Sequence, residues 1–139
     1  MLQIIIDQDF NLHDLAIAIS KILAIASDAI YIENGNLQPD KQYDPKYQIL
    51  CECFSSKGDF LTLLEKHSQK LVLTGHIEQI GDLEFASQFC DILNCRCLIA
   101  YDSPDSYAWI LVETSSRKQY VSLDSRRLDD YEEYVLETI

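Results

Sequence analysis

Glycine is scarce in this chain of 139 residues, which contains only four. They stand apart at Gly35, Gly58, Gly75 and Gly81, so they form neither a phosphate-binding P-loop nor a dinucleotide-binding loop. The G-x-S-x-G and H-E-x-x-H patterns are also missing, as is an H-x-E combined with C-x-x-C. These absences exclude the corresponding enzyme families, and we expect no cofactor.

Long hydrophobic runs and a leader are missing as well. No apolar run approaches the roughly 18 residues needed to cross a bilayer. The segment from Met1 to Asp7 carries no basic leader and no small-residue cleavage site. We therefore expect a cytoplasmic protein that does not enter a membrane. The length suits one domain over residues 1–139, and the apolar fraction of 47% is typical of a globular chain.

Basic residues are few, with 11 Lys and Arg against 23 Asp and Glu, which gives a net charge of −12. Such a charge repels nucleic acid and anionic membranes, because contacts to phosphate require cations. It attracts cationic proteins and speeds their association. The composition therefore favours a basic protein partner and no direct contact with nucleic acid. The alternative is that acidity only keeps the protein soluble.

The five cysteines are an odd number, so a complete disulfide framework is not expected. Cys51 and Cys53 are two residues apart, as are Cys95 and Cys97, and in a strand this spacing places each pair on one face. Cys90 falls on the inner side of a predicted helix. Structural zinc sites usually use C-x2-C spacing on turns, so we predict buried free thiols and no metal.

Only three histidines could act with a thiol in catalysis, namely His13, His67 and His76. His76 follows a strand, where loops often carry functional residues. It could meet one of three cysteines in the folded chain, Cys51, Cys53 or Cys97. A small enzyme with a Cys–His site therefore stays open as an alternative, although the residues favour a protein that is not an enzyme.

Hydrophobic spacing predicts one α+β domain. Residues 2–6 are expected to form a buried opening strand. Helical periodicity covers residues 11–26, where Asn11 is the expected N-cap, 59–69, and 83–94, where Asp82 is the expected N-cap. A last helix, capped by Asp124 or Ser125, runs to residue 139. Strand-like segments with short links at 95–101, 107–113 and 119–123 predict an antiparallel meander at the C-terminal end. We expect a mixed sheet of about five to six strands, which ends in this meander and is packed by about four helices.

Acidic residues concentrate in the second half of the chain, where they accompany tyrosines. Residues 71–139 contain 13 acids and 5 bases, and from residue 128 onward five acids meet no base. In the last helix Tyr131 fits the buried stripe, which leaves Tyr134 for the surface. Tyrosines beside carboxylates suit contact with Arg and Lys of a partner. The predicted binding residues are Tyr101, Asp102, Asp105, Tyr107, Asp129, Asp130, Glu132, Glu133 and Tyr134.

In size, acidity, lack of a leader and mixture of strands and helices, the chain resembles the small immunity proteins of bacterial contact-dependent and polymorphic toxin systems. The resemblance is one of composition and no motif carries it. It implies a protein that neutralises a basic toxin domain, for example a nuclease. We separately expect a monomer or weak dimer, since edge strands could pair two copies. A chaperone-like protein that holds a secreted effector is an alternative, but such chaperones usually begin with a helix.

Overall fold

The computed structural model describes residues 1–35, 42–57, 67–75, 80–101, 103–115, 117–131 and 133–137, with the backbone alone at 55–57, 67 and 68. Its strands are β1 (Leu2–Ile6), β2 (Ile30–Asn34), β3 (Ile49–Lys57), β4 (His67–Gly75), β5 (Cys97–Ala100), β6 (Ala108–Val112) and β7 (Lys118–Ser122). Its α-helices are α1 (Leu12–Leu23), α2 (Asp82–Leu93) and α3 (Ser125–Tyr131).

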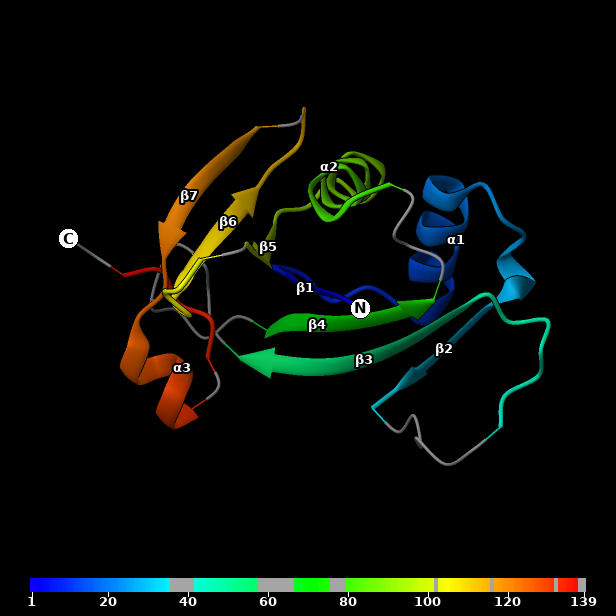
Figure 1. Cartoon of the computed structure of the whole chain (residues 1–139), viewed down its shortest axis with the longest axis horizontal. Helices are drawn as coiled ribbons and strands as arrows, with labels where there is room; N and C mark the ends of the chain where they lie inside the picture. Colours follow the sequence, from blue (N-terminus) through cyan, green and yellow to red (C-terminus); the bar gives the residue numbers. More distant parts are fainter. Residues whose placement is uncertain are drawn as a thin grey trace.

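The strands form one mixed sheet with the order β2-β3-β4-β1-β5-β6-β7 (Figure 1). β1 lies at the centre and pairs antiparallel with β4 on one side and β5 on the other. β2 and β3 form the parallel pair, whereas β5, β6 and β7 form the predicted antiparallel meander. The central position of β1 explains why four of its five residues are buried.

The two faces of the sheet have separate cores. Ile4 and Ile6 of β1 belong to the larger core, which the buried sides of α1 and α2 complete. Ile5 points to the opposite face and belongs to a smaller core with Trp109 and Tyr134. In Figure 1, α1 and α2 accordingly lie on one side of the sheet and α3 on the other. Alternation along β1 thus divides the molecule into a helix-covered face and a second face, which the C-terminal segment covers in part.

Local signals set the limits of the first helix. The Asn11 side chain accepts a hydrogen bond of 2.8 Å from the backbone N–H of Asp14, which caps α1 as predicted. The helix ends at Leu23 rather than residue 26, because Ala24 adopts a left-handed conformation with φ of 54°. At α2 the predicted cap is wrong, since Gly81 occupies the N-cap position and Asp82 is the first helical residue.

The predicted α+β class is confirmed, but the predicted numbers of strands and helices are wrong. The sheet has seven strands, and the described residues form three α-helices. Part of the expected helix over 59–69 is strand, because β4 begins at His67 and pairs with Lys57 at the end of a nine-residue antiparallel ladder. Residues 58–66 lie outside the described part. The polar residues 67–69 add nothing to the helical spacing, and there the pairing with β3 decides the structure.

The last helix is also shorter than predicted, since α3 ends at Tyr131. The chain then turns back. The N–H of Asp124 donates to the Val135 carbonyl at 2.8 Å, and Leu123 forms a β-bridge with Leu136. Within the described ranges, no helix is long and apolar enough to cross a membrane.

Candidate functional site

The link between β5 and β6 and the end of α3 lie together on the second face of the molecule. The Tyr107 hydroxyl donates a hydrogen bond of 2.5 Å to Oδ2 of Asp129. Asp105 and Asp130 are exposed close to these two residues in sequence. We call Asp105, Tyr107, Asp129 and Asp130 the turn–helix surface. The structure thus joins two segments that the sequence predicted separately.

Hydrogen bonds within the turn fix the first half of this surface. Oδ1 of Asp105 accepts from the backbone N–H of Tyr107 at 2.9 Å, and the Ser103 hydroxyl accepts from the N–H of Asp105 at 3.2 Å. Such side-chain-to-backbone bonds are the reason why Asp and Ser favour turns. One of these bonds is made by the backbone N–H of Tyr107, so the turn determines the position of the Tyr107 backbone.

Asp124 positions the second half, because it caps α3. Its Oδ1 accepts from the backbone N–H groups of Arg126 and Arg127, both at 3.1 Å. This confirms one of the two caps predicted from the sequence. Asp129 and Asp130 then fall in the last turn of the short helix, where carboxylates face the negative end of the helix dipole. Their position favours interaction with an external cation.

The predicted exposures of two tyrosines in the C-terminal segment are wrong. Tyr134 was expected at the surface but is 7% exposed, and its ring meets that of Trp109 at 5.7 Å. Tyr131 was expected in the core but is 66% exposed. The helical spacing of apolar residues continues beyond Tyr131 in the sequence, but the chain leaves the helix there and folds back over Trp109.

The remaining predicted residues divide between two places. Tyr101 packs edge-on against Tyr120 at 5.2 Å, and the alternation of β5 and β7 puts this pair on the face that carries α2, away from the turn–helix surface. Glu133 is half-buried and lies 3.5 Å from Nη1 of Arg127. Asp102 and Glu132 lie outside the described residues.

Sequence reasoning missed the part that Arg127 plays. Its guanidinium lies 6.0 Å from the centre of the Tyr131 ring in addition to its contact with Glu133. Together with Asp124, Arg126 and Tyr131 it lines a cavity of about 320 Å³. In the sequence, the two arginines stand just before a run of acids, which gives the segment a net negative charge and does not mark them as a pair with a structural role. The spacing of Arg127 and Tyr131, four residues apart in a helix, could have indicated their contact.

The electrostatics of Tyr107 follow from its carboxylate neighbours. The hydrogen bond to Asp129 stabilises the neutral phenol, and partial desolvation and the charges of Asp129 and Asp105 add to this effect, so the pKa of Tyr107 is raised. Among the described residues no basic side chain forms an ion pair with Asp129 or Asp130. The surface therefore presents carboxylates that the described part of the chain does not neutralise.

A second group of tyrosines, which the sequence analysis did not single out, lies beside β2. The Tyr31 ring lies 5.0 Å from that of Tyr43 and 5.1 Å from that of Tyr47. The Tyr31 hydroxyl donates to Glu33 at 2.6 Å, and this hydrogen bond raises the pKa of Tyr31 to about 12. The Lys46 ammonium lies 5.1 Å from the Tyr47 ring. This group brings together a loop and a strand edge, and it shows no arrangement of catalytic residues.

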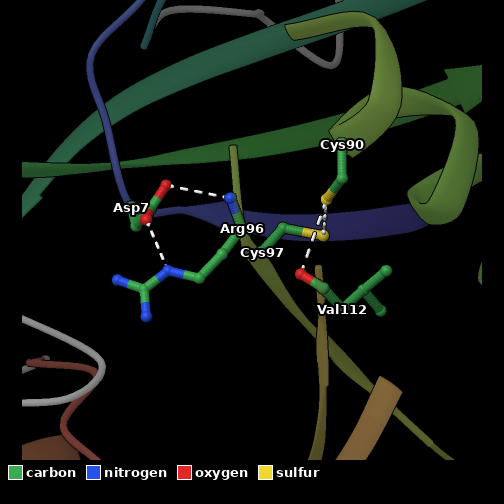
Figure 2. A network of polar contacts seen from close by, with 5 residues as sticks. All are labelled: Asp7, Cys90, Arg96, Cys97 and Val112. Atoms are coloured by element: carbon green, nitrogen blue, oxygen red, sulfur yellow. Dashed lines mark hydrogen bonds and ion pairs between the residues drawn. The ribbon is translucent and has the colours of Figure 1, made fainter. Parts of the chain in front are cut away.

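An ion pair and two buried thiols lie side by side near the start of β5 (Figure 2). A small enzyme with a cysteine site would need such polar groups beside a thiol. Asp7 accepts hydrogen bonds from the backbone N–H of Arg96 at 3.1 Å and from its Nε at 2.9 Å. Cys97 follows directly, and its sulfur lies 3.5 Å from that of Cys90. The five cysteines are free and buried, as predicted.

The described part of the chain contains no group of three or more His, Cys, Asp and Glu side chains able to hold a metal ion. His13 is exposed on α1, the side chain of His67 is not described, and His76 lies outside the described residues. The structure therefore assembles no Cys–His pair within its described part.

No protein-family model matches the chain, and neither the curated proteins nor the solved structures searched contain a match. A functional interpretation consequently rests on the residues and geometry described above.

Proposed function

We propose that this chain is a binding protein, not an enzyme, which neutralises a basic toxin domain through the turn–helix surface, as an immunity protein does. The proposal places it in the cytoplasm, where it acts as a monomer or weak dimer. The observation that carries it is the contact between Tyr107 and Asp129, because this contact makes one surface of two acidic segments.

The chemistry of the surface fits a partner rich in Arg and Lys. Asp105, Asp129 and Asp130 are exposed, and Tyr107 adds an aromatic ring held in place by a carboxylate. Carboxylates form charge-assisted hydrogen bonds with guanidinium groups, which are shorter and stronger than neutral ones. The net charge of −12 adds long-range attraction for a cationic domain.

The two arginines of α3 do not remove this attraction. Arg127 is engaged by Glu133 and Tyr131, and Arg126 lies one turn before the two neighbouring aspartates. A basic partner that approaches the end of α3 therefore meets Asp129 and Asp130 first. The arginines define one border of the surface, since they would repel a cationic side chain placed over them.

The experiment begins with the gene next to this one, because an immunity gene directly follows the gene of its toxin. The C-terminal domain of that toxin is purified and titrated with this protein by calorimetry at several salt concentrations. We expect a 1:1 complex whose affinity falls as salt rises, together with loss of the toxin's activity. A toxin domain that stays fully active at saturating protein would contradict the proposal.

A matched pair of variants tests the surface itself. Asp129→Lys with Asp130→Lys reverses two charges at the end of α3, where lysines suit the helix dipole and folding is retained. Asp9→Lys with Asp28→Lys changes the net charge equally at exposed positions elsewhere. We expect the first variant to lose about tenfold in affinity or more, and the second to lose clearly less. Equal losses would assign the attraction to net charge alone.

A further inference from the structure

Three thiols meet where α2 ends and β5 begins. Cys90 lies on the inner face of α2, Cys97 is the first residue of β5, and Cys95 is in the link between them. Their exposed fractions are 0%, 0% and 3%. The Cys90 thiol donates to the sulfur of Cys97 at 3.5 Å, and Cys95 lies within the same buried group. We call these three residues the thiol cluster. The proposed binding surface does not use it.

The geometry favours one pair in the cluster. A disulfide joins its sulfurs at about 2.05 Å, so Cys90 and Cys97 must approach by about 1.5 Å. They come from a helix and the strand beneath it, and Figure 2 shows their side chains directed at each other. Cys51 and Cys53 shift each other's pKa in opposite directions, but their geometry differs. They alternate along β3 with Cα atoms about 6.7 Å apart and parallel Cβ directions, which do not suit a disulfide. They are an internal control, since they are buried like Cys90 and Cys97 but are not placed to form a disulfide.

A cavity gives a small molecule a route toward the cluster. It has a volume of about 270 Å³ and is lined by Asp7, Gln8, Asn94, Cys95, Arg96, Glu113, Thr114 and Arg117. A water molecule occupies about 30 Å³ of liquid, and hydrogen peroxide is only slightly larger. An uncharged peroxide that enters the cavity therefore reaches Cys95, the member of the thiol cluster that lines it.

The three thiols of the cluster also differ in the direction in which their pKa is shifted. Hydrogen bonds from Cys95 and Cys97 lower the pKa of Cys90, whereas burial opposes its ionisation. Hydrogen bonding to Cys90 and burial raise the pKa of Cys95 and of Cys97. The Cys90 thiol itself donates to the Cys97 sulfur and to the Val112 carbonyl, both at 3.5 Å, so it ionises when the neighbouring thiols donate to it instead. Cys90 is thus the thiol from which an oxidation would start.

We propose that Cys90 and Cys97 are a peroxide-sensitive thiol pair that closes to an internal disulfide. The Cys90 thiolate attacks one oxygen of hydrogen peroxide, the O–O bond breaks, and the leaving hydroxide takes a proton to become water. Cys90 is then a sulfenic acid. The Cys97 sulfur loses its proton and attacks the Cys90 sulfur, the S–O bond breaks, and a second water leaves. Two thiols and one peroxide become one disulfide and two waters.

The full chain in its native state tests this inference. Reduced protein is treated with hydrogen peroxide, denatured with an alkylating reagent, and analysed by intact mass and peptide mapping. We expect two of the five thiols to be lost, the mass to fall by two hydrogen atoms, and one crosslink to join Cys90 to Cys97. Five free thiols after a treatment that oxidises the urea-unfolded chain would overturn the proposal. So would a crosslink between two chains or through Cys51 or Cys53.

Two variants locate the chemistry. In Cys97→Ser the second step cannot occur, and we expect a sulfenic acid at Cys90 that dimedone captures. The control variant, Cys51→Ala with Cys53→Ala, keeps the cluster and should form the disulfide as the wild type does. Circular dichroism checks that each variant is folded, and if Cys97→Ser is not, the crosslink map of the wild type decides alone. A disulfide that still contains Cys90 in folded Cys97→Ser would overturn the assignment of Cys97.

Discussion

The hydroxyl of Tyr107 lies 2.5 Å from Oδ2 of Asp129, although 22 residues separate them in the chain. Tyr107 lies in the link between β5 and β6, and Asp129 lies in α3. Helix α3 and the segment after it pack against β6, the strand that follows Tyr107. This contact joins two acidic segments of the second half of the chain into one surface. It also raises the pKa of Tyr107, which a titration can follow.

The titration of Tyr107 provides a pH-dependent prediction. Its pKa in the folded protein is raised above the usual tyrosine value of about 10, so the contact stabilises the fold below about pH 10 and is lost as pH rises through the folded pKa. In Asp129→Asn the hydrogen-bond acceptor stays but the charge is removed, and the pKa of Tyr107 should fall toward 10. NMR of labelled tyrosines measures the shift, and Tyr107→Phe identifies the resonance.

Tyr31 serves as the internal comparison for that titration. Its pKa of about 12 depends on Glu33 and not on Asp129, so Asp129→Asn should leave the Tyr31 resonance unchanged. A parallel shift of both resonances would indicate a general loss of structure. An unchanged Tyr107 resonance would show that its partner in solution is not Asp129.

The reversed exposures of two tyrosines predict unequal stability changes. Tyr134→Ala removes a buried ring that packs on Trp109 and should lower the free energy of unfolding by about 3 kcal/mol or more. Tyr131→Ala removes an exposed ring over Arg127 and should cost about 0.5 kcal/mol. Urea denaturation followed by Trp109 fluorescence measures both. Equal losses, or a larger loss for Tyr131→Ala, would show that the C-terminal segment packs differently.

The ion pair between Asp7 and Arg96 should contribute more to the free energy of unfolding than an ion pair at the surface. Asp7 accepts two hydrogen bonds from Arg96, and the side chains are 13% and 26% exposed. Asp7→Ala leaves a partly buried guanidinium and a backbone N–H without their acceptor, so we expect a loss of about 2 kcal/mol in the free energy of unfolding. Chemical denaturation at constant pH provides the measurement.

The matched control is Glu113→Gln, which breaks a pair with Arg117 at 4.0 Å. The Arg117 side chain is 78% exposed, and exposed pairs contribute little, so this variant should lose less than about 0.5 kcal/mol. If the two variants lose the same amount, the hydrogen bonds to Arg96 contribute no more than a surface contact.

The sequence by itself determined the features that depend on neighbours along the chain. The α+β class, the opening strand, the cap at Asn11, the C-terminal meander and the burial of the cysteines all follow from local spacing and from turn and cap residues. The acidic turn around residues 101–107 and the acidic end of the last helix were also predictable, but only as two separate segments, because each depends on neighbouring residues alone.

Only the tertiary structure decided where those segments meet and which tyrosine is buried. Residues 67–69 became strand, not helix, because antiparallel pairing of β4 with β3 satisfies their backbone groups, which the apolar spacing earlier in that segment does not record. After Tyr131 the chain turned back to pair with residues 122–124, which put Tyr134 on Trp109 and left Tyr131 in solvent. Contacts between residues far apart in the chain made these choices, and no periodicity within a single segment records them.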